Sequence, residues 1–412
     1  MNRYSTSRLS NGITVVSENL PYVKSFSLGL WINVGTRDEN KRNNGISHFL
    51  EHMFFKGTRN RTAKQISMEV EALGGYLNAF TSKEHTCFYG RGLLHNLEKT
   101  FVVLSDMLQN SLFDNKEIEK ESRVILDEMK DIEDSPEEII FDKFESALFK
   151  GSSLELPIIG TEKNVLGFKQ KDLINYIANK YSNDKLFIVA SGAIDHNFLI
   201  DIVEKHFNGS FGKNRKRAVR KYTSHTDKLF LEKPINQAHV IIGRNTIGYN
   251  SDNRMAVSLL SHILGGGSSS RLFLSVRERN GITYQINSFL NSFYDTSTFG
   301  VYFSTNEASV QKAIKLIFKE FEKLKKTKVS KKELNRAKEY LKGNLLMSLE
   351  STTNRMMQMA QSVIYFGRIK TIEEIIEKID SVTSDDILIL SNEILNKEDF
   401  STVLVNSKNI LN

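Results

Sequence analysis

The chain has 412 residues, which is too long for one hydrophobic core and predicts two or more domains. Hydrophobic residues make up 40% and charged residues 25%, and no apolar run reaches the roughly 18 to 20 residues of a membrane span, so an integral membrane protein is excluded. The net charge of +7 indicates a solvated lysine-rich surface, and we expect neither a nucleic-acid nor a membrane partner.

The start of the chain, residues 1–24, has no apolar core of a signal peptide, and we interpret it as mature sequence. The single cysteine, Cys87, cannot form an internal disulfide. Together these features favour a reducing, cytoplasmic location.

The first half of the chain alternates strand and helix patterns. Residues rich in β-branched and aromatic side chains predict strands, and apolar spacing with capping residues predicts helices. The expected strands are 11–18, 26–35 and a pair within 76–93, and the expected helices are 46–55, 62–75, 97–109 and 115–135. Pro136 should break or kink the last of these helices.

The second half repeats this order. The expected strands are 228–233, 238–245 and a pair within 283–305, and the expected helices are 254–266, 270–281, 308–326 and 330–351. The two strand pairs place Asn78 opposite Asn287, an offset of 209 residues, which is close to half the chain. An internal duplication explains this correspondence. We expect a first domain at 1–212, a basic linker at 213–222 and a homologous second domain at 223–412.

Two histidines stand one helical turn apart in "GISHFLEHMFFKGT", residues 45–58. On a helix His48 and His52 share one face, so both imidazoles can bind one Zn²⁺ ion. Glu51 lies in the same turn and can reach a metal-bound water as a general base. The order H-x-x-E-H is the inverted form of the zinc-peptidase string. A histidine pair without metal is the simpler alternative, because short strings recur by chance.

A catalytic zinc site needs a third protein ligand from another element. The acidic helix at 115–135 supplies candidates, and Glu121 and Glu128 lie seven apart on one of its faces. Spacing alone leaves the choice open, since a solvated face explains most acids of this helix: Glu117, Glu119, Asp127, Asp131 and Glu133.

The stretch at 45–58, together with "ESRVILDEMKDIE" at 121–133, resembles the pitrilysin/insulinase family of zinc peptidases. The branch that contains mitochondrial processing peptidase and its bacterial relatives is the most similar. The resemblance covers nearly the whole chain, including "GTRDE" before the motif. It implies that Glu128 is the third ligand of one Zn²⁺ per chain and that Glu121 supports the site.

The resemblance also implies further site residues. Arg277 and Tyr284 in "VRERNGITYQI" have the spacing of a pair that binds substrate and stabilises the oxyanion. An ordinary helix end at Gly281 is the alternative for this stretch. Asn78 and Ala79 lie on a strand that pairs with the peptide backbone in the family.

The implied architecture is an α+β fold with two homologous domains, each a mixed β-sheet with helices packed on one face, forming half of a clam-shaped dimer. The implied activity is zinc-dependent endopeptidase cleavage of oligopeptides or unfolded segments in an enclosed chamber. A homodimer is the simplest assembly, with a heterodimer as its alternative. Two other functions stay open: a presequence-processing subunit that works with a separate partner chain, and a non-catalytic structural subunit.

Overall fold

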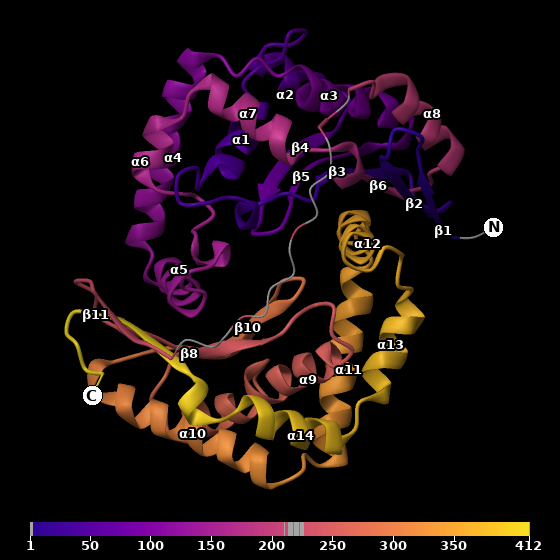
Figure 1. Ribbon diagram of the computed structural model, residues 1–412. Helices are drawn as coiled ribbons and strands as arrows, with labels where there is room; N and C mark the ends of the chain where they lie inside the picture. Colours follow the sequence, from indigo (N-terminus) through magenta and orange to yellow (C-terminus); the bar gives the residue numbers. More distant parts are fainter. Residues whose placement is uncertain (1–2, 210, 213–216, 218–221, 223–225, 412) are drawn as a thin grey trace. The chain divides into compact units, whose positions relative to one another are not determined.

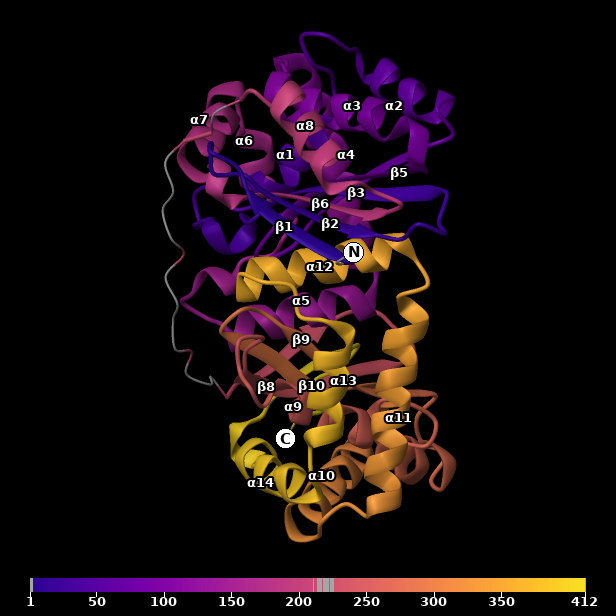
Figure 2. The ribbon, with the colours of Figure 1, turned by 90° about the vertical axis from the view of Figure 1, so that its right-hand side faces the viewer.

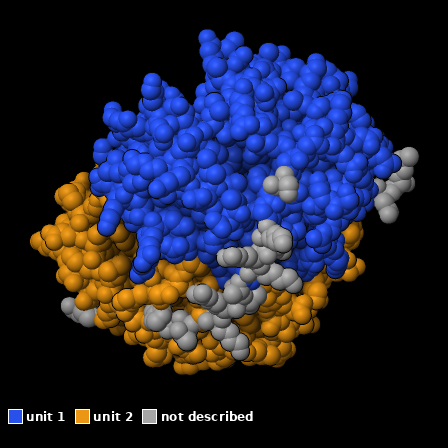
Figure 3. Space-filling view, turned by 45° about the horizontal axis from the view of Figure 1, so that its top comes forward, with its two compact units in different colours: residues 1–130, 156–218, 347–370 blue, residues 131–155, 219–346, 371–412 orange. Residues whose placement is uncertain are grey.

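A computed structural model describes residues 3–209, 211–212, 217, 222 and 226–411. The chain divides into two compact units, each of which draws on both halves of the sequence (Figure 3). Unit 1 comprises residues 1–130, 156–218 and 347–370, and unit 2 comprises residues 131–155, 219–346 and 371–412.

Unit 1 is a six-stranded sheet with helices (Figure 1). Its strands are β1 (Tyr4–Arg8), β2 (Thr14–Asn19), β3 (Ser25–Ile32), β4 (Tyr76–Thr81), β5 (Thr86–Leu93) and β6 (Leu186–Gly192). Its helices are α1 (Ile46–Phe54), α2 (Ala63–Ala72), α3 (Leu97–Asn110), α4 (Asn115–Asp134), α6 (Glu162–Gly167), α7 (Gln170–Lys180), α8 (His196–His206) and α12 (Thr352–Phe366). Residues 131–134 at the end of α4 are counted in unit 2.

Unit 2 contains a five-stranded sheet. Its strands are β7 (Lys228–Glu232), β8 (Ala238–Ile247), β9 (Gln285–Ser292), β10 (Thr296–Thr305) and β11 (Ser401–Asn406). Its helices are α5 (Pro136–Leu148), α9 (Arg254–Gly265), the π-helix η5 (Phe273–Glu278), α10 (Val310–Lys326), α11 (Lys331–Ser348), α13 (Ile372–Ser381) and α14 (Ser384–Ile394). Short 3-10 turns lie at Thr36–Asp38, Leu94–Asn96, Ser153–Glu155, Asn183–Lys185, Glu307–Ser309 and Lys397–Asp399.

Apart from the additional edge strand β1 in unit 1, the two sheets have the same topology, which supports the duplication. The strand order is β1-β2-β6-β3-β5-β4 in unit 1 and β7-β11-β8-β10-β9 in unit 2. In each sheet one parallel pair, β2 with β6 or β7 with β11, stands among antiparallel neighbours. The registers agree as well, since Asn78 lies opposite Tyr89 and Asn287 opposite Tyr302. Both β4 and β9 therefore lie at the edge of their sheets, as duplicated strand pairs should.

In unit 1, helices α3 and α8 pack on one face of the sheet, and α12 packs on the opposite face (Figures 1 and 2). The α12 face is a buried cluster in which Met356 contacts Trp31, whose indole Nε1–H donates to Met356 Sδ at 3.2 Å. Gly29 makes room for this helix, because a Cβ there would lie 2.7 Å from the same sulfur. Alternating strand residues thus bury both faces of the sheet.

Unit 2 has the matching arrangement. Helices α9, α10 and α14 surround a core on one face of its sheet, and α5 packs on the other face. Phe144 of α5 lies in a cluster with Ile241 and Tyr302. The α5 segment comes from the first half of the sequence but belongs to unit 2. Helix α12 comes from the second half but belongs to unit 1.

The predicted α+β class with two related units is confirmed, and each expected strand and helix has a counterpart, whereas the dimer stays a prediction. Pro136 opens a new helix, α5, as the first residue after a Ser135 cap. Two features differ from expectation. Residues 273–278 form a π-helix. The second face of each sheet is also covered, by α12 in unit 1 and by α5 in unit 2. Most of the expected linker, 213–222, lies outside the described residues, and the domain limits stay a prediction.

Across the described part of the chain, no helix combines the length and the apolar character that crossing a bilayer requires.

Candidate metal centre

Helix α1 carries the histidine motif and is almost wholly buried. Gly45 precedes the helix with a φ of +95°, a conformation that side chains other than glycine rarely adopt. Phe49, Leu50 and Met53 fix the helix in the core of unit 1. The rings of His48 and His52 then lie on a common face, with centroids 4.7 Å apart.

A buried carboxylate anchors the start of α1. Glu39 Oε2 accepts hydrogen bonds from Gly45 N at 2.7 Å and Asn44 Nδ2 at 3.0 Å, and Oε1 accepts one from Ser47 N at 2.8 Å. The backbone N–H groups of Gly45 and Ser47 have no partner within the helix, so the Glu39 carboxylate acts as its N-terminal cap. Burial raises the pKa of Glu39 to about 7, against the opposing effect of the hydrogen bonds from Ser47 and Gly45.

Replacing Glu39 by Ala should destabilise the protein by about 2–4 kcal/mol, because it leaves buried N–H donors without an acceptor. Chemical denaturation would measure the loss, and hydrogen exchange at residues 45–48 should become faster. Glu71→Ala, at an exposed position of α2, is the matched control and should change stability by less than about 0.5 kcal/mol. Equal stability of the two variants would refute the anchoring role.

Glu128 of α4 meets the two histidines. Its carboxylate oxygens lie 3.7 Å from His48 Nε2 and 3.7 Å from His52 Nε2. One ligand atom from each of the three residues lies within 4.8 Å of the other two, and no other such group of His, Cys, Asp or Glu occurs among the described residues. The Glu128 side chain is 42% exposed, so the cluster opens to solvent on its side. Two imidazole nitrogens and one carboxylate oxygen are the donor set of a catalytic zinc site.

The state of His48 fits a metal ligand. Burial, with an added effect of the neighbouring His52, lowers the pKa of His48 to about 3, so the ring is neutral at physiological pH. A neutral imidazole is the form that binds metal. Its Nδ1 atom is buried without a hydrogen-bond partner in the described part of the chain. The residues present therefore fit a zinc ion.

Glu121 contacts Nδ1 of His52, the ring nitrogen that does not face Glu128. Its Oε2 lies 3.1 Å from His52 Nδ1, and its Oε1 pairs with Lys56 Nζ at 2.6 Å. Burial opposes ionisation of Glu121, but the hydrogen bonds from His52 and Lys56 outweigh it and lower its pKa. An ionised Glu121 would hold the proton of His52 on Nδ1 and leave Nε2 facing Glu128.

Replacing Glu121 by Gln should weaken zinc binding by about 10–100-fold, because His52 loses the charged acceptor that fixes its tautomer. Competition with a chromophoric chelator would measure the affinity. Glu119→Gln on the same helix, where the side chain pairs with exposed Arg123, should bind zinc as the wild type does. Affinities within about twofold for Glu121→Gln would show that Glu121 does not orient His52.

Glu51 is oriented by the sheet. Thr81, the last residue of β4, donates its hydroxyl hydrogen bond to Glu51 Oε2 at 2.6 Å. Burial raises the pKa of Glu51, and the Glu128 carboxylate adds to the rise, while Thr81 and His52 oppose it. A carboxylate with a raised pKa is a stronger base.

The remaining predicted residues lie on two other elements. Asn78 and Ala79 are on β4, which pairs with β5 and forms an edge of the unit 1 sheet. The Asn78 side chain accepts a hydrogen bond from Ala79 N at 2.8 Å. Arg277 and Tyr284 come together in unit 2, with the guanidinium carbon 5.2 Å from the centre of the tyrosine ring. Tyr284 is 79% exposed, and its role in catalysis stays a prediction.

Sequence reasoning missed three residues of this site. Lys56 had a partial signal, because it follows His52 by four residues, although it lies just beyond the end of α1 at Phe54. Thr81 and Glu39 had none, since their contacts depend on how the sheet and the preceding turn pack against α1.

The chain belongs to the insulinase family, peptidase family M16. The family description "Insulinase (Peptidase family M16)" matches residues 14–162, and "Peptidase M16 inactive domain" matches residues 167–341. The zinc protease YmxG of Bacillus subtilis, a protein described as uncharacterized, is 36% identical over 96% of both chains. The mitochondrial-processing peptidase subunit beta of Saccharomyces cerevisiae is 32% identical over 97% of this chain and 90% of its own.

Solved structures agree on the fold. A protease from Helicobacter pylori has a TM-score of 0.89 at 22% identity, covering 98% of this chain and 99% of its own. A protein from Pseudomonas fluorescens, titled as a peptidase M16 inactive domain, has a TM-score of 0.91 at 18% identity over the full length of both chains. At these identities the structures support the fold alone, whereas the sequence relatives carry the assignment to a zinc-protease family.

Proposed function

We propose that this chain is a zinc-dependent endopeptidase in which His48, His52 and Glu128 hold one Zn²⁺ ion. The observation that carries the proposal is the meeting of these three side chains around one point, with Glu51 on the same helix. Membership in a family whose relatives are named zinc proteases supports it.

When bound, zinc supplies Lewis-acid chemistry, lowering the pKa of a water molecule and polarising the scissile carbonyl. Glu51 removes a proton from the attacking water and returns it to the leaving amine. Thr81 holds the Glu51 carboxylate in position, and Glu121 holds the ring of His52. Arg277 and Tyr284 bind the peptide and stabilise the oxyanion in this scheme.

The substrates we propose are oligopeptides or unfolded segments. Among the described residues of unit 1 no strand neighbours the outer edge of β4, so an extended peptide can add to it as a further strand. Asn78 and Ala79 would then face the substrate backbone, next to the Thr81–Glu51 contact. Such pairing recognises main chain and suits loose sequence preference. An enclosed chamber built from two chains would exclude folded proteins.

A second candidate is a processing peptidase that requires a separately encoded partner. The similarity to the mitochondrial-processing peptidase subunit beta over 97% of this chain favours it. His48, His52 and Glu128 all belong to unit 1 of one chain, so a homodimer and a heterodimer would contain the same metal centre. For either assembly we propose a cytoplasmic location.

Incubation of the purified chain with an unstructured peptide library tests the proposal. We expect cleavage that stops with a chelator and returns with added zinc, from an assembly whose native mass is that of two chains. Cleavage only after addition of a second gene product would favour the processing subunit. Bound zinc with no cleavage under either condition would favour a structural subunit and refute the peptidase.

A further inference from the structure

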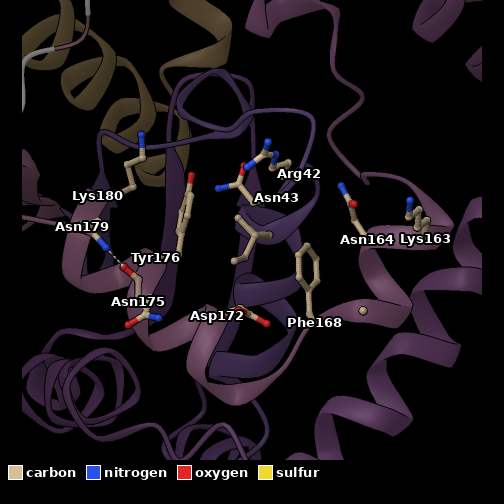
Figure 4. A pocket seen from close by; sticks show the side chains of 12 residues that line it. Arg42, Asn43, Lys163, Asn164, Phe168, Asp172, Asn175, Tyr176, Asn179 and Lys180 are labelled. Atoms are coloured by element: carbon tan, nitrogen blue, oxygen red, sulfur yellow. Dashed lines mark hydrogen bonds between the residues drawn. The ribbon is translucent and has the colours of Figure 1, made fainter.

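Unit 1 contains a cavity of about 480 Å³ that shares no residue with the candidate metal centre. It lies between the segment that leads into α1, helix α6 and helix α7 (Figure 4). Its volume is within the range of small-molecule sites.

The lining of the cavity is cationic. Arg42, Lys163 and Lys180 contribute to it, and no described carboxylate forms an ion pair with any of these three side chains. Asp172 is the one acidic residue of the lining, and its carboxylate already accepts a hydrogen bond from Lys169 N at 3.0 Å as part of the cap of α7. An anion in the cavity would therefore find cations without having to displace an internal partner.

Amide groups and aromatic rings complete the lining. Figure 4 shows α7 residues on one side, Phe168 and α6 residues on the other, and Arg42 with Asn43 between them. The asparagines of the lining are Asn43, Asn164, Asn175 and Asn179. Phe168 and Tyr176 are each 5% exposed, so their rings lie behind the lining and present little surface to a ligand. Cations for an anionic group and amides for polar atoms are the features of a site for an organic anion.

The three cationic side chains of the lining favour a ligand that carries more than one negative charge. A carboxylate carries one charge, whereas a phosphate monoester carries about two at neutral pH and offers three acceptor oxygens. Arginine binds phosphate through two parallel N–H groups, and lysine binds it as a point charge. The cavity volume also exceeds what an inorganic ion alone would fill.

The cavity touches the elements that hold α1. Ile46, the first residue of that helix, is part of the lining. The Asn164 amide donates to the carbonyls of Lys41 at 3.2 Å and Asn44 at 3.1 Å, and the Tyr176 hydroxyl lies 3.0 Å from Ser47 Oγ. A ligand bound by both Arg42 and α7 would thus restrain the segment before α1 relative to α7.

We propose that this cavity binds a phosphate-bearing small molecule, with Arg42 and Lys180 on the phosphate and the side-chain amides of Asn43 and Asn175 on the rest of the ligand. Binding restrains residues 41–47, the segment on which the position of α1 depends.

Calorimetric titration of the full-length protein at constant ionic strength tests the site, with AMP and inorganic phosphate as probes. The double variant Arg42→Gln, Lys180→Gln should bind about tenfold more weakly or worse, because two charged donors to the phosphate are lost. Lys171→Gln is the matched control, since Lys171 is an exposed residue of α7 that does not line the cavity. Hydrogen exchange at residues 41–47 should slow when the probe binds.

Tighter binding of AMP would identify a phosphate ester as the ligand class, and equal binding of both probes would identify free phosphate. Either result supports the site if the double variant loses it and Lys171→Gln keeps it. No binding at about 10 mM probe, or equal binding by the double variant and the control, would overturn the proposal. Thermal unfolding of each variant without probe shows whether the fold is intact, and cleavage assays are not needed.

Discussion

Glu51→Gln should lower the rate of peptide cleavage by about 10²–10⁴-fold, because glutamine cannot accept the proton of the attacking water. The change preserves the shape of the side chain and its carbonyl oxygen, so the hydrogen bond from Thr81 can persist. Zinc content should stay at the wild-type value, since Glu51 is not one of the three converging ligands. Steady-state kinetics on an unstructured peptide, with zinc measured on the same sample, would check both expectations.

Glu71→Gln, on the exposed surface of α2, serves as the control for this change and should retain full activity. If Glu51→Gln cleaves the peptide within about tenfold of the wild-type rate, Glu51 is not the general base. Loss of zinc together with activity would instead give Glu51 a part in holding the metal, and the assignment of ligands would need revision.

His48→Ala should abolish stoichiometric zinc binding and peptide cleavage together. The change removes one of three ligands, and two protein ligands do not hold zinc in a catalytic site. Emission spectrometry of dialysed protein would give the zinc content per chain. His95→Ala removes an exposed histidine elsewhere in unit 1 and should keep one zinc per chain.

The truncation also leaves a gap at a position that is 9% exposed, so the fold must be checked separately. Circular dichroism and thermal unfolding of the metal-free wild type and of His48→Ala provide that comparison. A folded His48→Ala variant that still contains one zinc per chain would contradict the proposed centre.

Local sequence patterns sufficed for the elements and for the histidine pair. Helix α1 and the strand pair β4–β5 follow from side-chain periodicity, and the spacing of His48 and His52 fixes their common face. The third ligand could not be chosen this way, because Glu121 and Glu128 share a face of α4. The choice depends on how α4 crosses α1, which lets Glu121 reach His52 Nδ1 and Glu128 reach the Nε2 atoms.

Features that depend on packing between distant segments had no local signal. Amphipathic spacing shows that α5 and α12 each have a face to bury, but not that each packs on the sheet built from the other half of the sequence. The hydrogen bonds of Glu39 to the start of α1 have the same origin, since the accepting carboxylate and the donating N–H groups are joined by a turn whose path the sequence does not show. The cavity beside α1 likewise has no local signal, because it is lined by the segment before α1, by α6 and by α7, and the first of these is distant in the sequence from the other two.

The central claim is that His48, His52 and Glu128 bind one metal ion. Anomalous diffraction at the zinc absorption edge, from crystals of the zinc-loaded protein, tests it most directly. We predict a single peak within about 2.0–2.2 Å of the Nε2 atom of each histidine and of one carboxylate oxygen of Glu128. A peak bound to other residues, or a Glu128 carboxylate pointing away from the zinc, would contradict the account.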